Sequence, residues 1–157
     1  MPYLDTRQFG RIEYQEEAVM EFPRGLPAFE DQTRFLLIEK PGFSPIVFLQ
    51  SVLRGDLCFL TIPVSSIEPD YRLSVALEDL ETVRTDLAAF PNGRLLWLAI
   101  LSVTEVGPAT ANLLAPVLVN LDSRHGVQAV RLDAAYSHQH QVALPGGRAS
   151  REETACS

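Results

Sequence analysis

The sequence predicts an all-β, or mainly β, fold: a small closed or semi-closed antiparallel β-barrel, or a sandwich, with one short helix. Apolar runs of about six to eight residues recur along the chain and are rich in β-branched and aromatic side chains. Turn signals such as KPGFSP and RGD separate these runs. One segment alone has apolar residues at the spacing of three and four that a helix requires. Closure of the sheet would remove exposed strand edges.

The N-terminal half divides into short strands and one ordered loop. Residues 6–14 predict two strand pieces joined by a turn at Gly10, and residues 18–22 predict another short strand. The stretch FPRGLPAFED, residues 22–31, follows, and its prolines and glycine indicate an ordered loop rather than a regular element. Three apolar strands are then predicted, at residues 34–39, 45–52 and 57–64.

The C-terminal half contains the predicted helix and three more strands. The helix covers residues 78–90, and its apolar face is formed by Leu77, Leu80, Val83, Leu87 and Phe90. Acidic residues lie in its first turn, where the helix dipole favours them. Residues 107–111 are expected to form a loop and residues 123–126 a turn. The strands are predicted at residues 94–103, 116–122 and 127–133.

Composition and charge narrow the possible classes of protein. We expect one domain over residues 1–144 and a disordered tail over residues 145–157, which lacks core-forming side chains. No apolar run approaches the roughly 20 residues of a membrane span, and the N-terminus lacks signal-peptide features, so we expect a cytoplasmic protein. The net charge of −7 disfavours direct nucleic-acid binding and suits a basic protein partner. Cys58 is expected to be a small buried hydrophobe that does not pair with Cys156.

Catalytic and metal-binding signatures are weak in this sequence. It contains no nucleophile elbow, phosphate-binding loop or dinucleotide fingerprint. His138 and His140 would lie on the same side of a strand and, with His125, are the candidates for a metal site, although zinc usually takes three or four protein ligands. Ser123 lies near His125 but has no recognisable third partner. We therefore predict no enzyme activity, no cofactor and no metal.

Apolar residues on stiff loops are the more specific feature. Leu26 and Phe29 lie among prolines, and Tyr71 follows a rigid Pro–Asp. In ATANLLAPVLVNLD, residues 109–122, the period of two places Val117, Val119 and Leu121 toward the core. Such loops either cap the end of a barrel or present a surface that docks another protein, and we favour the docking surface.

Seven stretches in register resemble the FliW family of bacterial flagellar assembly factors. They are FGRIEY, FPRGLPAFED, SPIVFLQSV with DLCFLTIPV, EPDY, TANLLAPVLVN, RHGVQAVRLD and YSHQH, and they cover residues 9–140. Ala28 departs from a family pattern that usually has glycine at that position.

The resemblance implies a β-barrel-like protein that is not an enzyme. It implies binding to flagellin in the cytoplasm before export and, when flagellin leaves, binding to CsrA, an RNA-binding repressor of flagellin translation. Relief of repression is expected to act allosterically, away from the RNA-contacting surface of CsrA. We expect the chain to be a monomer on its own.

Candidate partner-binding residues follow from exposure and loop stiffness rather than from the resemblance. They are Leu26, Phe29, Glu68, Asp70, Tyr71, Asn112, Leu113 and Leu114. Two other functions stay open at this stage. One is a metal-dependent hydrolase that uses the three histidines, and the other is a structural accessory protein of the flagellum that does not exchange partners.

Overall fold

The described part of the chain folds around one large β-sheet. The computed structural model describes residues 2–26, 28–68, 76–85, 94–103, 107–129 and 139–142. The predicted tail, residues 145–157, and the domain boundary at residue 144 lie outside these ranges, so both stay predictions. No helix among the described residues is long and apolar enough to cross a bilayer.

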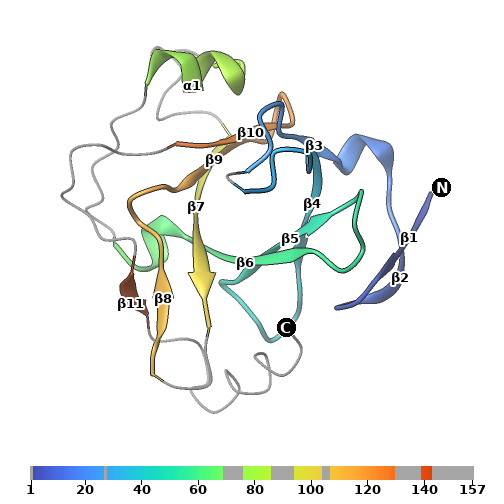
Figure 1. Ribbon diagram of the computed structural model, residues 1–157, viewed down its shortest axis with the longest axis horizontal. Coiled ribbons are helices and arrows are strands. Elements are labelled where there is room, and N and C mark those ends of the chain that lie inside the picture. The colour runs from blue at the N-terminus through green and yellow to red at the C-terminus, as the bar shows by residue number, and fades with distance from the viewer. Residues whose placement is uncertain are drawn as a thin grey trace.

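The strands and the helix occur in the order that the sequence predicts (Figure 1). The predicted turn at residues 123–126 is partly wrong, because β10 begins at His125. The strands are β1 (Tyr3–Thr6), β2 (Gly10–Glu13), β3 (Met20–Glu21), β4 (Arg34–Glu39), β5 (Val47–Ser51), β6 (Cys58–Pro63), β7 (Leu95–Ser102), β8 (Ala109–Ala111), β9 (Val117–Asn120), β10 (His125–Gln128) and β11 (His140–Val142). The helices are α1 (Leu77–Thr82) and two 3-10 turns, η1 (Glu16–Ala18) and η2 (Val64–Ser66).

Seven of the described strands close into a barrel. Their order around the ring is β7-β6-β5-β4-β3-β10-β9, and β9 pairs back to β7. A ring with an odd number of strands cannot alternate direction throughout, so one pair must be parallel. That pair is β3–β10, which has a single partnered position, His125 opposite Glu21. The predicted mainly β barrel with one short helix is confirmed, with this parallel pair as its closing seam.

A glycine makes the seam possible. Beyond His125, the ring of Phe22 lies against Gly126, and a Cβ atom at that position would lie 2.4 Å from the ring. Phe22 is fully buried and stacks edge-on against Phe35, with 5.2 Å between the ring centroids. Packing of an aromatic ring on bare backbone therefore closes the barrel where ladder hydrogen bonds end.

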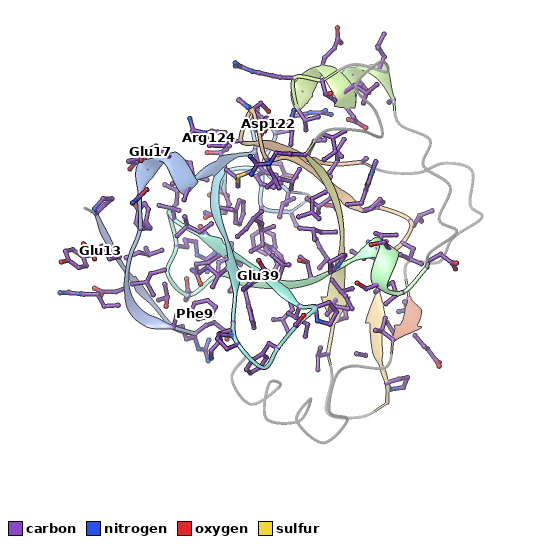
Figure 2. The ribbon with its side chains drawn as sticks, turned by 180° about the vertical axis from the view of Figure 1, so that it is seen from behind. Phe9, Glu13, Glu17, Glu39, Asp122 and Arg124 are labelled. Carbon is purple, nitrogen blue, oxygen red and sulfur yellow. The ribbon has the colours of Figure 1, made fainter. Side chains whose placement is uncertain are left out.

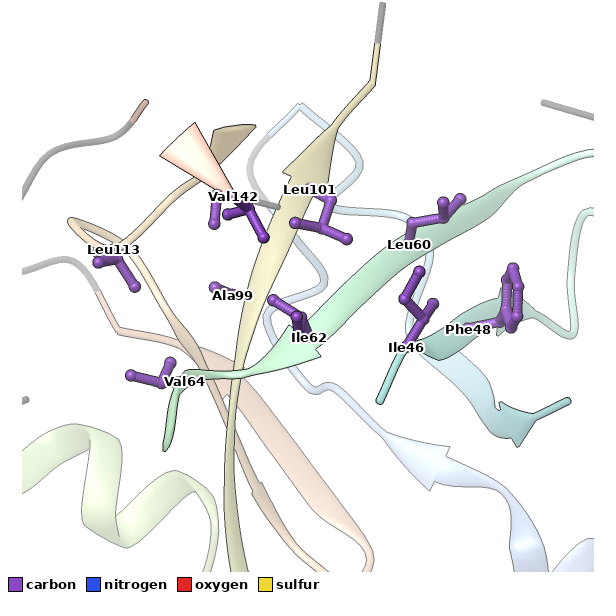
Figure 3. Close-up of a cluster of buried hydrophobic side chains, with 10 residues drawn as sticks. Ile46, Phe48, Leu60, Ile62, Val64, Ala99, Leu101, Leu113 and Val142 are labelled. Carbon is purple, nitrogen blue, oxygen red and sulfur yellow. The ribbon is translucent and has the colours of Figure 1, made fainter. Parts of the chain in front are cut away.

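Two hydrophobic clusters lie on opposite faces of the barrel wall. The inner cluster contains buried residues from strands all around the ring, including Phe35, Leu49, Leu98 and Val117. The outer cluster covers one side of the wall and includes, as Figure 3 shows, Ile46, Phe48, Leu60, Ile62, Val64, Ala99, Leu101, Leu113 and Val142. Burial on both faces explains why the central strands are almost continuously apolar rather than alternating.

Two further pairs of strands attach to the outside of the barrel. Strands β8 and β11 extend the sheet from β7 and cover the outer cluster. The predicted loop at residues 107–111 is therefore partly wrong, because β8 begins at Ala109. The β1–β2 hairpin forms a separate two-stranded sheet at the periphery (Figure 1). It is fastened by Phe9, whose ring lies edge-on against Phe48.

The helix packs with a smaller face than the sequence predicts. Leu80 and Val83 are buried, and Val83 forms a third small cluster with Leu118 and Val127. Leu77 is 67% exposed, so its predicted place on the buried face is wrong. Leu87 and Phe90 lie outside the described residues. The carbonyl of Val83 accepts hydrogen bonds from Asn120 Nδ2 and Ser123 Oγ, both 2.8 Å, which fix the helix end to the β9–β10 turn.

Candidate protein-interaction surface

The loop at residues 22–33 closes one end of the barrel. Leu26 is 2% exposed and belongs to the inner cluster. The main chains of Leu26 and Phe29 bond to each other, with N–H to C=O distances of 2.7 and 3.3 Å, so the chain reverses direction sharply between them. Ala28 completes this reversal at φ 72°, in the left-handed region. An alanine here stands in a conformation that glycine adopts without a steric penalty.

Three contacts hold this loop in place. Gly25 has a positive φ, and a Cβ atom there would lie 2.6 Å from the backbone of Glu30. Arg24 Nη2 donates to Asp79 Oδ1 and to Thr82 Oγ1, both at 2.7 Å, which ties the loop to α1. The buried Gln32 accepts a 2.7 Å hydrogen bond from the Ser51 hydroxyl. The loop is therefore held in one conformation, and we call residues 22–33 the plug.

Of the side chains of Leu26 and Phe29, the plug leaves only that of Phe29 accessible. Phe29 is half-buried, and its ring lies edge-on against Phe59 with 5.5 Å between centroids. The expectation that Leu26 is exposed at the rim is wrong, because its side chain fills the barrel interior. Phe29 retains an exposed portion that can touch another molecule.

The turn at residues 112–115 also has one buried and one partly exposed apolar side chain. Asn112 Oδ1 accepts hydrogen bonds from the backbone N–H of Leu114 (3.1 Å) and Ala115 (3.0 Å). This side-chain turn fixes the direction of both leucines. Leu113 is fully buried in the outer cluster (Figure 3), so its predicted exposure is also wrong. Leu114 is half-buried and faces the surface in part.

Glu68 lies in the same part of the molecule as this turn. Its backbone N–H donates to the carbonyl of Val64 (2.8 Å), and Val64 and Leu113 share the outer cluster. Glu68 itself is half-buried. Asp70 and Tyr71 lie outside the described residues. Phe29 packs on the inner cluster instead. The predicted contact residues therefore do not all lie against the same cluster.

The histidine alternative has no support in the described residues. His125 Nδ1 lies 2.7 Å from the Ser123 carbonyl oxygen, while the Ser123 hydroxyl donates to Val83 O. The two side chains are thus engaged with backbone rather than with each other, unlike a nucleophile and its base. No group of three or more candidate metal ligands occurs within the described ranges. His138 and the side chain of His140 lie outside them.

Cys58 is a half-buried free thiol on β6. Burial raises its pKa to about 12, because desolvation disfavours the thiolate. A thiol that stays protonated at neutral pH is a poor nucleophile and a poor metal ligand. Cys58 packs against the outer cluster but is only half-buried, so its predicted burial is correct in part. Cys156 lies outside the described residues.

A polar pocket of about 350 Å³ lies beside the β3–β10 seam, and no sequence pattern predicts it. It is lined by Glu16, Glu17, Val19, Glu21, Arg34, Ser123, Arg124 and His125. Figure 2 places Glu17 and Arg124 along the same side of the molecule. Arg34 donates to the carboxylates of Glu16 (2.5 Å) and Glu21 (3.2 Å), and the hydrogen bond to Glu16 is the main cause of the raised pKa of Arg34. The lining residues come from segments about a hundred positions apart, so hydrophobic periodicity in the sequence could not predict that they lie together.

The comparisons with known proteins identify the family. A model of the FliW protein family matches residues 3–142. The chain belongs to the FliW family. It is 34% identical over 137 residues to the flagellar assembly factor FliW of Syntrophomonas wolfei, covering 87% of this chain and 85% of that protein. It is also 34% identical over 148 residues to the FliW of Natranaerobius thermophilus, covering 94% of this chain and 97% of that protein.

A solved FliW structure has the same fold. The crystal structure of a flagellar assembly factor FliW superposes with a TM-score of 0.78 and 27% sequence identity, and the match covers 89% of this chain and 96% of that one. The resemblance inferred from seven short stretches is therefore confirmed, and so is the β-barrel fold. This chain is a member of a family of flagellar assembly factors.

Proposed function

We propose that this FliW-family chain is a non-catalytic regulator that exchanges two protein partners. It binds flagellin in the cytoplasm and, when flagellin is exported, binds CsrA and relieves the repression of flagellin mRNA translation. The observation that carries this proposal is the family match across residues 3–142, which spans the whole described barrel. Relief acts from a site on CsrA away from its RNA-contacting surface.

The charge of the chain supports a basic partner. The net charge is −7, and complementary charge speeds association and favours a partner of opposite sign. Exposed acidic residues occur on several elements, among them Glu13, Glu30, Glu78 and Asp122. An acidic surface repels phosphate backbones, so the chain acts on translation through a protein rather than by touching RNA.

The proposed contact surface is centred on the turn at residues 112–115. Leu114 and Asn112 present its accessible part, and Glu68 belongs to the neighbouring segment. Asp70 and Tyr71, which follow Glu68 in the sequence and lie outside the described residues, stay predicted contacts. Phe29 is a second contact on the barrel plug. Leu26 and Leu113 act from beneath by holding these loops in shape, and they make no direct contact with a partner.

Titration of the purified chain into CsrA and, separately, into flagellin tests the proposal by calorimetry. We expect both complexes to form at micromolar concentration. Leu114→Asp should weaken at least one of them tenfold or more, because it places a charge in an apolar contact. Leu53→Asp is the matched control, since Leu53 is an equally apolar side chain, 53% exposed, in the β5–β6 turn. The proposal fails if neither partner binds.

A further inference from the structure

The outer edge of β2 carries backbone groups that point away from its own hairpin. Tyr14 N donates to Pro2 O (3.1 Å), and β1 and β2 pair with Leu4 opposite Ile12. Hydrogen-bonded and non-hydrogen-bonded pairs alternate in an antiparallel ladder, so Ile12 bonds to β1. Arg11 and Glu13 therefore direct their N–H and C=O groups outward. Within the described residues, neither main chain has a hydrogen-bond partner on that side.

The opposite edge of the hairpin is already occupied. Arg7 N donates to Gly55 O (3.0 Å), and a Cβ atom on Gly55 would lie 1.9 Å from the carbonyl oxygen of Asp5. The β5–β6 turn thus lies directly against β1. This contact agrees with the alternation, because the backbone N–H and C=O groups of odd-numbered residues point away from the hairpin. It leaves β2 as the edge that can accept another strand.

The side chains on β2 specify which strand fits best. Arg11 and Glu13 are exposed, and Ile12 between them is half-buried. An antiparallel strand would complement this edge with a basic residue opposite Glu13, an apolar residue opposite Ile12 and an acidic residue opposite Arg11. Read from its N-terminus, that partner is basic, apolar, acidic. The order is the same as in β2 itself, Arg11–Ile12–Glu13.

We propose that two copies of this chain associate through β2 about a two-fold axis at Ile12. Arg11 of each copy lies opposite Glu13 of the other, and these pairs exchange backbone hydrogen bonds. The two Ile12 side chains meet at the axis. Because a two-fold axis closes after two copies, the result is a four-stranded sheet shared by a dimer rather than a fibre.

The association is weak because the edge is short. β2 has four residues, far fewer than contribute to the roughly 1,200–2,000 Å² that stable dimers bury. The chain is therefore a monomer at low micromolar concentration, and the dimer forms as concentration approaches the millimolar range. This inference is independent of flagellin and CsrA, so its failure would leave the proposed regulatory function untouched.

Charge-swapped variants measured by sedimentation equilibrium test the register directly. Arg11→Glu makes the β2 side chains of both copies acidic, and Glu13→Arg makes them basic, so each variant alone should lose self-association about tenfold or more. An equimolar mixture of the two variants should regain it, because opposite charges face each other again. The double variant Arg11→Glu/Glu13→Arg should also regain it. Glu17→Arg on η1 changes the net charge as much as Glu13→Arg does, and it should leave self-association unchanged.

Thermal melts of each variant keep the outcome interpretable. Arg11 also pairs with Asp5 (2.8 Å), but both side chains are exposed, so the loss of that pair should alter the melting temperature little. The restored mixture could not arise from misfolded variants. The proposal is overturned if the unaltered chain stays monomeric to millimolar concentration, or if the mixture and the double variant fail to associate.

Discussion

The plug at residues 22–33 and the turn at residues 112–115 solve the same packing problem by different means. Each buries one leucine, Leu26 at 2% exposure and Leu113 at 0%, and leaves a second apolar side chain half-buried. The plug is held by a close glycine approach, an ion pair to α1 and a buried Gln–Ser hydrogen bond. The turn depends on a single carboxamide, that of Asn112, which accepts two backbone hydrogen bonds.

The comparison shows that apolar residues on stiff loops serve the core first. Leu26 fills one end of the seven-stranded barrel, whereas Leu113 fills a site in the outer cluster. The docking surface that we propose uses what remains partly exposed, namely Phe29 on the plug and Leu114 on the turn. Of the two neighbouring leucines in residues 109–122, Leu113 is fully buried and Leu114 is half-buried.

The largest expected effect separates adjacent leucines. Leu113→Ala should destabilise the fold by about 2–5 kcal/mol, since it empties a fully buried site, and Leu26→Ala should fall in the same range. Leu114→Ala should cost less than about 1 kcal/mol. Urea unfolding of the three variants measures the difference. Similar losses at Leu113 and Leu114 would mean that the turn buries both, which would remove the proposed contact surface.

A smaller loss of stability is expected when the Asn112 side chain, which holds the turn, is removed. Asn112→Ala removes the acceptor of two backbone N–H groups and should cost about 1 kcal/mol. Asn112→Asp keeps an oxygen in place and should retain most of the stability. Urea midpoints at pH 7 compare the two variants with the unaltered chain. If Asn112→Asp is as unstable as Asn112→Ala, the oxygen is not what holds the turn.

The smallest expected effect is a gain in the plug. Ala28→Gly should raise the free energy of unfolding by about 0.5–1 kcal/mol, because glycine adopts φ 72° without the steric penalty of a Cβ atom and this exceeds its entropic cost. For a chain of this length the gain corresponds to a few degrees in melting temperature, which calorimetry resolves. A loss of stability would place Ala28 at negative φ in solution.

Much of the barrel could be predicted because its strands have strong local signals. The apolar runs that became β4 to β7 are long, rich in β-branched side chains and bounded by turns. Strand β8 was missed because its three residues, Ala–Thr–Ala, follow Gly–Pro and are too small to show a pattern. The closing seam was invisible because it consists of one paired position between segments a hundred residues apart.

The candidate surface was harder to predict, because exposure depends on where a loop folds back. Leu113 and Leu114 are identical residues in adjacent positions, and only the Asn112 turn decides which one enters the core. Leu26 has the same ambiguity among its prolines. Asn, Pro and Gly signalled the turns correctly, yet their spacing does not say which face of each turn meets the barrel.

A displacement experiment tests the central claim, exchange between two protein partners, most directly. CsrA carrying a fluorescent label is first saturated with the purified chain, and flagellin is then added while anisotropy is recorded. We expect anisotropy to fall to the value of free CsrA, with the chain recovered in a complex with flagellin. An anisotropy that stays high or rises would mean that flagellin does not displace CsrA, and would contradict partner exchange.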